Sequence, residues 1–215
     1  MTTTNPVKQR LILKTSRYYI FSILLCLSTA GNAIEPDYVE LGKQGIEAFR
    51  VGNLMQAMDL LGKSAAKGYA PAQTTLAYIL DKSEDDDAAF KLFQQAAEQG
   101  YAEGQFGLGG MYAKGEGTTL DPVKAGELIR QSAMQNYIPA VRAYAKALEY
   151  GNLGFTRNLA QAVESYQLCH DLGDSVCTYR LAQAYKTGEL GLPVDINRST
   201  QLTLQLNQKS DEKKK

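Results

Sequence analysis

The sequence predicts an all-α fold, an α/α solenoid of about five helical hairpins. A helix–turn–helix pattern, clearest from Asp85 to Gly117, recurs along the chain at intervals of 32, 36 and 37 residues. Each unit begins with Asp or Asn, and small and large apolar residues keep fixed places after it. A period of this length is typical of stacked supersecondary units, which bury their apolar faces against their neighbours.

The recurring positions indicate helices and tight turns. When the repeats are aligned, their first shared position forms a column of Asp and Asn residues. This column predicts helix N-caps, because such a side chain accepts a hydrogen bond from a free N–H group of the first helical turn. Its members are Asn53, Asp85, Asp121, Asn158 and Asp195. The turn column supplies the left-handed residue that ends a helix, and its members are Gly68, Gly100, Asn136 and Gly173. A small residue follows each turn, where neighbouring helices are expected to approach closely, at Ala72, Gly104, Ala140 and Cys177.

Residues 1–33 are expected to be a secretory signal peptide that is removed from the mature protein. Its basic residues are Lys8, Arg10, Lys14 and Arg17, and the segment contains no acidic residue. The apolar run 18–27 is shorter than the roughly 20 residues that a membrane helix needs. We expect cleavage after Ala33 ahead of Ala30, with an uncleaved anchor as the alternative. A periplasmic protein without a membrane span after signal cleavage is therefore predicted.

The mature chain is predicted to be one repeat domain, residues 34–208, followed by a charged C-terminal tail, residues 209–215. No linker or low-complexity segment interrupts residues 38–208. The first helix is expected from Tyr38 to Phe49 and the last from about Ile196 to Gln208. Without the signal segment, 19 basic residues stand against 23 acidic ones. This balance does not favour nucleic acid as a partner, because nucleic-acid-binding domains are usually strongly basic.

The pattern resembles the Sel-one-like repeat family, α/α-solenoid relatives of the tetratricopeptide repeat. The residues that carry the resemblance are Met111 to Gly117, Asp121, Lys124-Ala125 and Gln131-Ser132-Ala133 before Asn136. It covers roughly residues 40–208 and departs from the family pattern at the short connector Lys82-Ser83-Glu84 and at Asn136. The resemblance implies protein–protein interaction. Exported members act as adaptors of envelope assemblies, as regulators of membrane sensors, or as immunity proteins that neutralise secreted effectors.

Cys169 and Cys177 are the only cysteines that remain after signal cleavage. The repeat alignment places them on the two helices of one hairpin, in columns where the backbones come closest. A disulfide needs such a short Cα separation, and export makes an oxidising compartment the expected one. The segment between them also resembles the cysteine-rich, secreted branch of the family, in which a disulfide links the two helices of each hairpin. The alternative is two reduced cysteines that serve as small core residues.

Other candidate chemical features have structural explanations. His170 lies beside Cys169, but a structural zinc site needs four ligands. Glu84–Asp87 lacks the ligand pattern of a calcium loop and suits a helix N-terminus. A glycine-rich stretch lacks the strand and lysine of a phosphate loop and is expected to mark close helix packing instead; its glycines are Gly107, Gly109 and Gly110.

We therefore expect no metal, no cofactor, no catalytic residue and no enzymatic activity. The competing prediction comes from the resemblance to the cysteine-rich branch. It is the binding or hydrolysis of a cell-wall or β-lactam ligand.

The resemblance to tetratricopeptide arrays implies that the first helix of each repeat lines a concave binding face. The candidate partner-binding residues on these helices are Tyr78, Lys82, Phe106, Lys114, Arg142, Lys146, Tyr179, Arg180 and Lys186. We counted only two acids near them, Asp81 and Glu149. The expected partner is another protein that binds through an acidic segment, with aromatic residues as anchors. Mutual repulsion of the bases in the free protein is also expected; the alternative is that these are solvated helix faces.

Overall fold

The structure, a computed structural model, describes residues 37–212, with side chains as far as residue 208. The predicted signal peptide, with its cleavage site, and residues 213–215 of the predicted tail lie outside the described residues. From Tyr38 onward the chain belongs to one compact unit.

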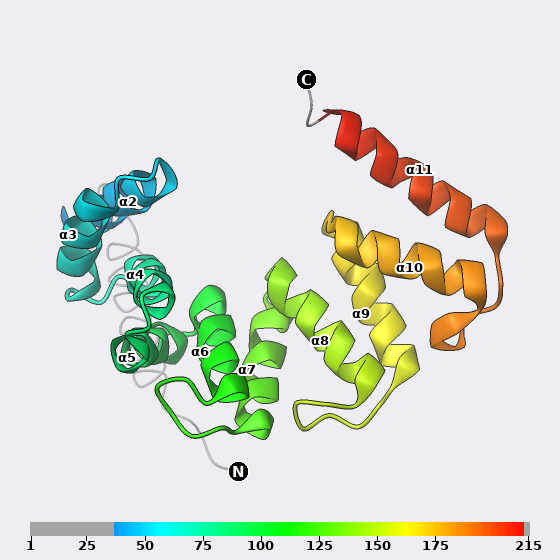
Figure 1. The fold of residues 1–215 in the computed structure, drawn as a ribbon, viewed down its shortest axis with the longest axis horizontal. Coiled ribbons are helices and arrows are strands. Elements are labelled where there is room, and N and C mark those ends of the chain that lie inside the picture. Colours follow the sequence, from blue (N-terminus) through cyan, green and yellow to red (C-terminus); the bar gives the residue numbers. More distant parts are fainter. Residues whose placement is uncertain (1–36, 213–215) are drawn as a thin grey trace, which may run out of the picture. The chain divides into compact units, whose positions relative to one another are not determined.

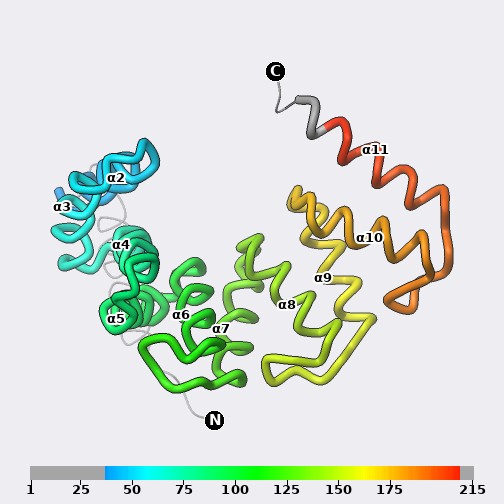
Figure 2. The backbone as a smooth tube through the Cα atoms, viewed as in Figure 1, coloured from blue at the N-terminus to red at the C-terminus, as the bar shows by residue number. Residues whose placement is uncertain are grey.

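All regular elements of residues 37–212 are helices (Figure 1). They are α2 (Asp37–Arg50), α3 (Leu54–Ala65), α4 (Ala70–Lys82), α5 (Asp86–Glu98), α6 (Ala102–Lys114), α7 (Pro122–Met134), α8 (Ile138–Tyr150), α9 (Leu159–Asp171), α10 (Ser175–Thr187), the short 3-10 helix η2 (Glu189–Gly191) and α11 (Ile196–Glu212). The backbone turns back after each helix (Figure 2), and from α3 to α11 each α-helix packs against the next one along the chain. The predicted array of helical hairpins is confirmed for this part of the chain.

The five predicted N-caps all form, because each side chain accepts a hydrogen bond from a backbone N–H of the first turn. The acceptor–donor pairs are Asn53 with Gln56 N at 3.4 Å, Asp85 with Ala88 N at 3.4 Å, Asp121 with Lys124 N at 3.0 Å, Asn158 with Gln161 N at 3.1 Å and Asp195 with Arg198 N at 2.9 Å. A sixth cap was not predicted: Asp174 accepts from the N–H of Cys177 at 2.8 Å and begins α10.

The turn column also has the predicted conformation. The φ angles are 88° at Gly68, 76° at Gly100, 62° at Asn136 and 93° at Gly173. Asparagine is one of the few non-glycine residues that adopt this left-handed region readily. Asn136 therefore replaces the turn glycine without changing the turn.

Close helix packing is confirmed at three of the glycines of α6, Gly104, Gly107 and Gly109, and wrong at Gly110; a Cβ atom on Gly109 would lie 3.0 Å from Cγ1 of Ile129. A Cβ atom on Gly104 would lie 2.6 Å from the Cβ of Ala96, and one on Gly107 would meet the ring of Phe93 at 2.3 Å. At Gly110 an added Cβ would meet nothing within 4 Å, so this glycine makes no close contact. The sequence did not distinguish Gly110 from the other glycines of this helix, but its Cα faces open space.

The last helix is longer than expected. It continues to Glu212, into the segment that was predicted to be a charged tail. The residues after Gln208 include neither glycine nor proline, so no strong stop signal ends the helix there. Among the helices of residues 37–212, none meets the length and hydrophobicity that a membrane span requires.

Candidate functional site

The candidate site is a cavity of about 450 Å³ lined by residues of α6, α8, α9 and α10. Its apolar lining comes from Phe106, Pro139, Ala143 and Val176, together with the rings of Tyr150 and Tyr166. Its charged lining comes from Arg142, Lys146, Glu149 and Arg180. The lining of the cavity therefore combines apolar side chains with mainly basic ones.

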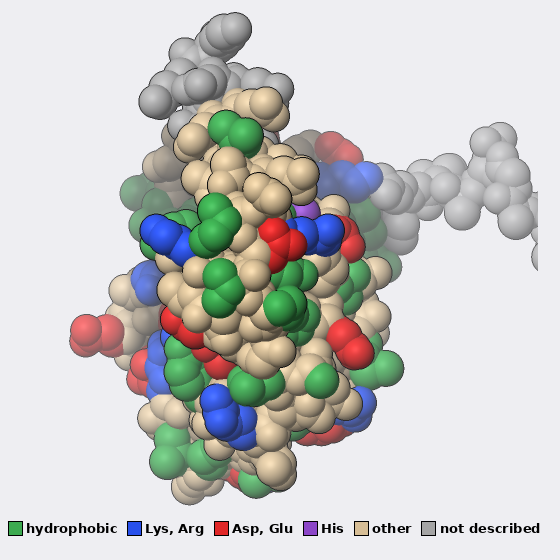
Figure 3. All heavy atoms as spheres, turned by 90° about the vertical axis from the view of Figure 1, so that its right-hand side faces the viewer, with side chains coloured by type: hydrophobic (Ala, Val, Ile, Leu, Met, Phe, Trp, Pro, Cys, Tyr) green, Lys and Arg blue, Asp and Glu red, His purple; other side chains and the backbone are tan. Residues whose placement is uncertain are grey.

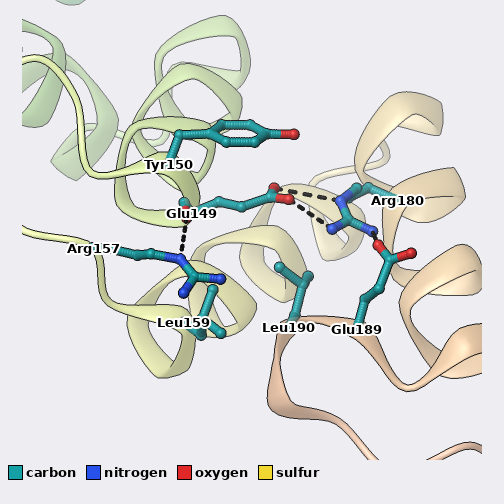
Figure 4. A pocket seen from close by; sticks show the side chains of 7 residues that line it. All are labelled: Glu149, Tyr150, Arg157, Leu159, Arg180, Glu189 and Leu190. Atoms are coloured by element: carbon teal, nitrogen blue, oxygen red, sulfur yellow. Dashed lines mark hydrogen bonds and ion pairs between the residues drawn. The ribbon is translucent and has the colours of Figure 1, made fainter.

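A second cavity, of about 250 Å³, adjoins the first and shares Glu149, Tyr150 and Arg180 with it. In Figure 4 the Glu149 carboxylate faces the guanidinium of Arg180, whose other side faces Glu189. Arg157 lies on the opposite side of the same cavity and donates from Nε to the backbone oxygen of Glu149 at 3.1 Å. The pair of Glu149 and Arg180 thus borders both cavities.

Glu149 is buried and both of its carboxylate oxygens are engaged. Oε1 accepts from Arg180 Nη2 at 2.6 Å, and Oε2 accepts from the hydroxyl of Tyr166 at 2.6 Å and from Arg180 Nε at 3.3 Å. Arg180 Nη1 also pairs with Glu189 at 2.8 Å. Charge-assisted bonds of this two-pronged kind fix the position of both partners, so α8, α9 and α10 are tied together beneath the cavity.

This network shifts the ionisation of its members. Burial raises the pKa of Glu149, but hydrogen bonds from Arg180 and Tyr166 outweigh it and hold that pKa below its usual value. Burial, followed by the hydrogen bond to Glu149, raises the pKa of Tyr166. The hydrogen bond to Glu149 raises the pKa of Arg180. Glu149 is therefore a carboxylate at neutral pH, with Arg180 as its counterion.

The other two cations of the cavity differ in how they are neutralised. Arg142 Nη1 pairs with Asp174 at 3.0 Å. Lys146 is exposed and makes no ion pair or hydrogen bond with any residue that the structure describes. Lys146 therefore contributes the positive charge that the protein itself does not offset.

The structure brings four of the nine candidate binding residues together around this cavity: Phe106, Arg142, Lys146 and Arg180. The remaining five do not line it. Tyr78 is half-buried and packs edge-on against Phe93, with ring centroids 5.0 Å apart, and Lys114 pairs with Glu116 at 2.9 Å. Lys82, Tyr179 and Lys186 are exposed on α4 and α10.

The expected repulsion among the bases is wrong for both arginines. Arg142 and Arg180 are neutralised by carboxylates 32 and 31 residues away in the sequence, Asp174 and Glu149. Glu149 was expected to be an acid of the groove, but its burial was not predicted, and neither were the contacts of Asp174, Glu189 and Tyr166. No local pattern marks these residues, because Asp174 and Tyr166 meet partners 32 and 17 residues away in the sequence and Glu189 lies in η2, after the helix that carries Arg180.

The structure contains the predicted disulfide between Cys169 and Cys177, with a Cα–Cα distance of 5.8 Å. Both residues are buried in the cluster that α8, α9 and α10 share. A carboxylate oxygen of Asp174 lies within 4.8 Å of the sulfurs, but they are bonded to each other and Asp174 caps α10. His170 Nδ1 lies 2.8 Å from the hydroxyl of Thr178, as a half-buried packing residue would.

The surface at the C-terminal end of the unit has no dominant charge. In Figure 3 acidic and basic side chains are interspersed on this face, with apolar side chains between them. The cavity differs from this face because three of its four charged lining residues are basic.

Comparison with known proteins identifies the repeat. The family model of the Sel1 repeat matches residues 70–101, 102–137, 138–168 and 175–205. Each matched segment begins at or near the start of an even-numbered helix, so the repeat unit pairs α4 with α5, α6 with α7, α8 with α9 and α10 with α11.

The chain is similar to two curated proteins and to solved repeat structures. It is 29% identical over 138 residues to the ERAD-associated E3 ubiquitin-protein ligase component HRD3A of Arabidopsis thaliana, covering 56% of this chain. It is 28% identical over 141 residues to the chitin synthase regulator SKT5 of Saccharomyces cerevisiae, covering 63% of this chain. The match spans only 20% of each of those proteins. The crystal structure of a Sel1 repeat protein from Oxalobacter formigenes superposes with a TM-score of 0.71 at 29% identity, covering 80% of this chain and 69% of that one.

Proposed function

Because the chain belongs to the Sel1 repeat family, we propose that it is an exported scaffold that binds another protein and catalyses no reaction. Its role is that of an adaptor or regulator in the bacterial envelope. Neutralising a secreted effector as an immunity protein is a special case of the same activity.

The observation that supports this proposal is the cavity of about 450 Å³ with its apolar and basic lining. Interfaces are anchored by apolar and aromatic side chains that enter such pockets, surrounded by polar contacts that exclude water. Helical repeat arrays offer extended surfaces on which such a pocket can receive a partner chain. The names of the similar proteins, a ligase component and a synthase regulator, are those of proteins that act with other proteins.

The proposal is tested by capturing partners from a periplasmic extract on the immobilised protein and on matched variants, with identification by mass spectrometry. Val176→Arg places a charged side chain in the cavity, whereas Lys91→Glu changes an exposed charge on α5 that does not line it. We expect one partner to be recovered by the unmodified protein and by Lys91→Glu but lost by Val176→Arg. Equal recovery on all three baits would reject the cavity as the binding site.

Export is part of the proposal and has its own test. The order of basic residues, apolar run and small residues in positions 1–33 supports it. The intact mass of the protein recovered from periplasm should correspond to a chain that begins after Ala33. Recovery of the full-length chain in the membrane fraction would instead support an uncleaved anchor.

The competing enzymatic function is distinguished by a direct assay. Purified protein incubated with a chromogenic β-lactam should show no hydrolysis above the buffer rate. Sustained turnover would replace the scaffold proposal.

A further inference from the structure

We propose that the cavity between α6, α8 and α10 receives one bulky apolar side chain of a partner polypeptide, and that Lys146 binds an acidic residue next to it. This inference rests on the proposed function and adds which chemistry the partner must present. It also identifies Lys146, and not Arg180, as the residue that determines specificity.

The apolar half of the inference follows from the lining of the cavity. Phe106, Pro139 and Val176 come from three different helices and offer carbon surface to the same space. The volume of about 450 Å³ lies within the range of roughly 300 to 1,000 Å³ that is usual for small-ligand sites. That is room for a large side chain with its flanking backbone. Val176 is 53% exposed, so apolar surface remains open to solvent until a partner covers it.

The preference for an acidic residue of the partner follows from the one basic side chain of the cavity that has no counterion in the part of the chain that the structure describes. Both sides of the Arg180 guanidinium are occupied, by Glu149 and by Glu189, and Arg142 is held by Asp174. Among the described residues Lys146 has no such partner, and it lines the same cavity. A partner carboxylate would therefore meet the Lys146 ammonium group without displacing any existing ion pair.

The same geometry disfavours a basic partner. The only carboxylate that lines the cavity is Glu149, and both of its oxygens already accept hydrogen bonds from Arg180 and Tyr166. A lysine or arginine of a partner would have to break this buried network or remain unpaired beside Lys146, and an unpaired charge in such a place is costly. The cavity therefore selects acidic over basic partners by repelling the basic ones as well as by attracting the acidic ones.

In this arrangement Arg180 is a positioning residue. It pairs with the Glu149 carboxylate, which also lines the cavity, and ties α8 to α10. Its replacement should mainly lower thermal stability, because the buried Glu149 carboxylate would lose its counterion. Replacement of Lys146 should leave thermal stability nearly unchanged and weaken the preference for acidic ligands.

The test is the selection of random displayed peptides on the immobilised protein, followed by fluorescence anisotropy of the selected peptides as labelled probes. We expect the selected sequences to place Asp or Glu beside a large apolar residue. Lys146→Glu should weaken their binding about three- to tenfold, as expected for one charge at the rim of an interface. Val176→Arg should weaken it more than about tenfold, because it fills the anchor pocket. Lys91→Glu, the same charge change on α5, should leave binding unchanged, and circular dichroism shows whether each variant remains folded.

Several results would overturn the inference. They are selected peptides without acidic residues, unchanged binding to Lys146→Glu, or no peptide selected at all. If a protein partner is nevertheless captured in a way that depends on Val176, the proposed scaffold function stands and only the chemistry assigned to its ligand is wrong. Val176-sensitive peptides without any captured partner would instead remove the scaffold function and leave a peptide site.

Discussion

At the scale of the residue, the Glu149 carboxylate gives the site its pH dependence. Its pKa is lowered in the folded protein, so its contribution to stability is present above its ordinary pKa of 4.5 and is lost as the pH falls through the folded value. Glu149→Gln should lower the melting temperature at pH 7, by the equivalent of about 2 kcal/mol, because the charge-assisted hydrogen bonds with Arg180 are lost. Glu189 remains as a second counterion of Arg180.

The measurement is a thermal unfolding series of Glu149→Gln and the unmodified protein from pH 7 to pH 3. The difference between their melting temperatures should shrink as the pH falls below 4.5, the ordinary pKa of this carboxyl group. A difference that stays constant with pH would show that the pKa of this carboxyl group is the same in the folded and the unfolded protein.

Two glycines of α6 make a matched pair for testing close packing. Gly104→Ala forces a Cβ to within 3.0 Å of the backbone carbon of Ala96, and overpacking of this kind typically costs ~1–3 kcal/mol. Gly110→Ala meets nothing within 4 Å and should stabilise the helix by about 0.5–1 kcal/mol, since alanine loses less entropy there. Chemical denaturation of the two variants measures both effects. Equal effects of the two substitutions would contradict the packing described for α6.

At the scale of the element, the disulfide joins α9 to α10. Replacing both cysteines with alanine should cost about 2–3 kcal/mol in the chain-entropy model for so short a loop. Because repeats couple mainly to their neighbours, hydrogen exchange should become faster in α9 and α10 and stay unchanged in α4 and α5. Uniform acceleration along the chain would show that the repeats unfold as a single unit.

The elements themselves could be predicted from the sequence because their signals are local. Asp121 caps α7 through the N–H of a residue three positions later, and Asn136 forms its turn within one hairpin. The end of α11 was misplaced because no Gly or Pro marks it.

Contacts between repeats were not predictable in this way. Arg180 reaches Glu149 across 31 residues, and whether they meet depends on how one repeat is rotated on the next. One group of contacts between helices that was not predicted could have been recognised from the sequence. Gln73 and Gln105 occupy the same repeat position, and each hydrogen-bonds two glutamines, one in the following helix and one directly after it. Recurrent polar residues at core positions therefore indicate inter-helix hydrogen bonds in such repeats.

At the scale of the whole molecule, the central claim is that a partner chain covers the face of α8 and α10 beside the cavity. Hydroxyl-radical footprinting of the protein with and without its captured partner tests this most directly, because it reports exposed side chains one at a time. Tyr150 and Tyr179 are 61% and 57% exposed on α8 and α10, and Met134, 72% exposed at the end of α7, serves as the control. The account predicts that the partner protects both tyrosines from oxidation and leaves Met134 as reactive as before. Protection of Met134 with both tyrosines still reactive would contradict it and place the partner on the odd-numbered helices.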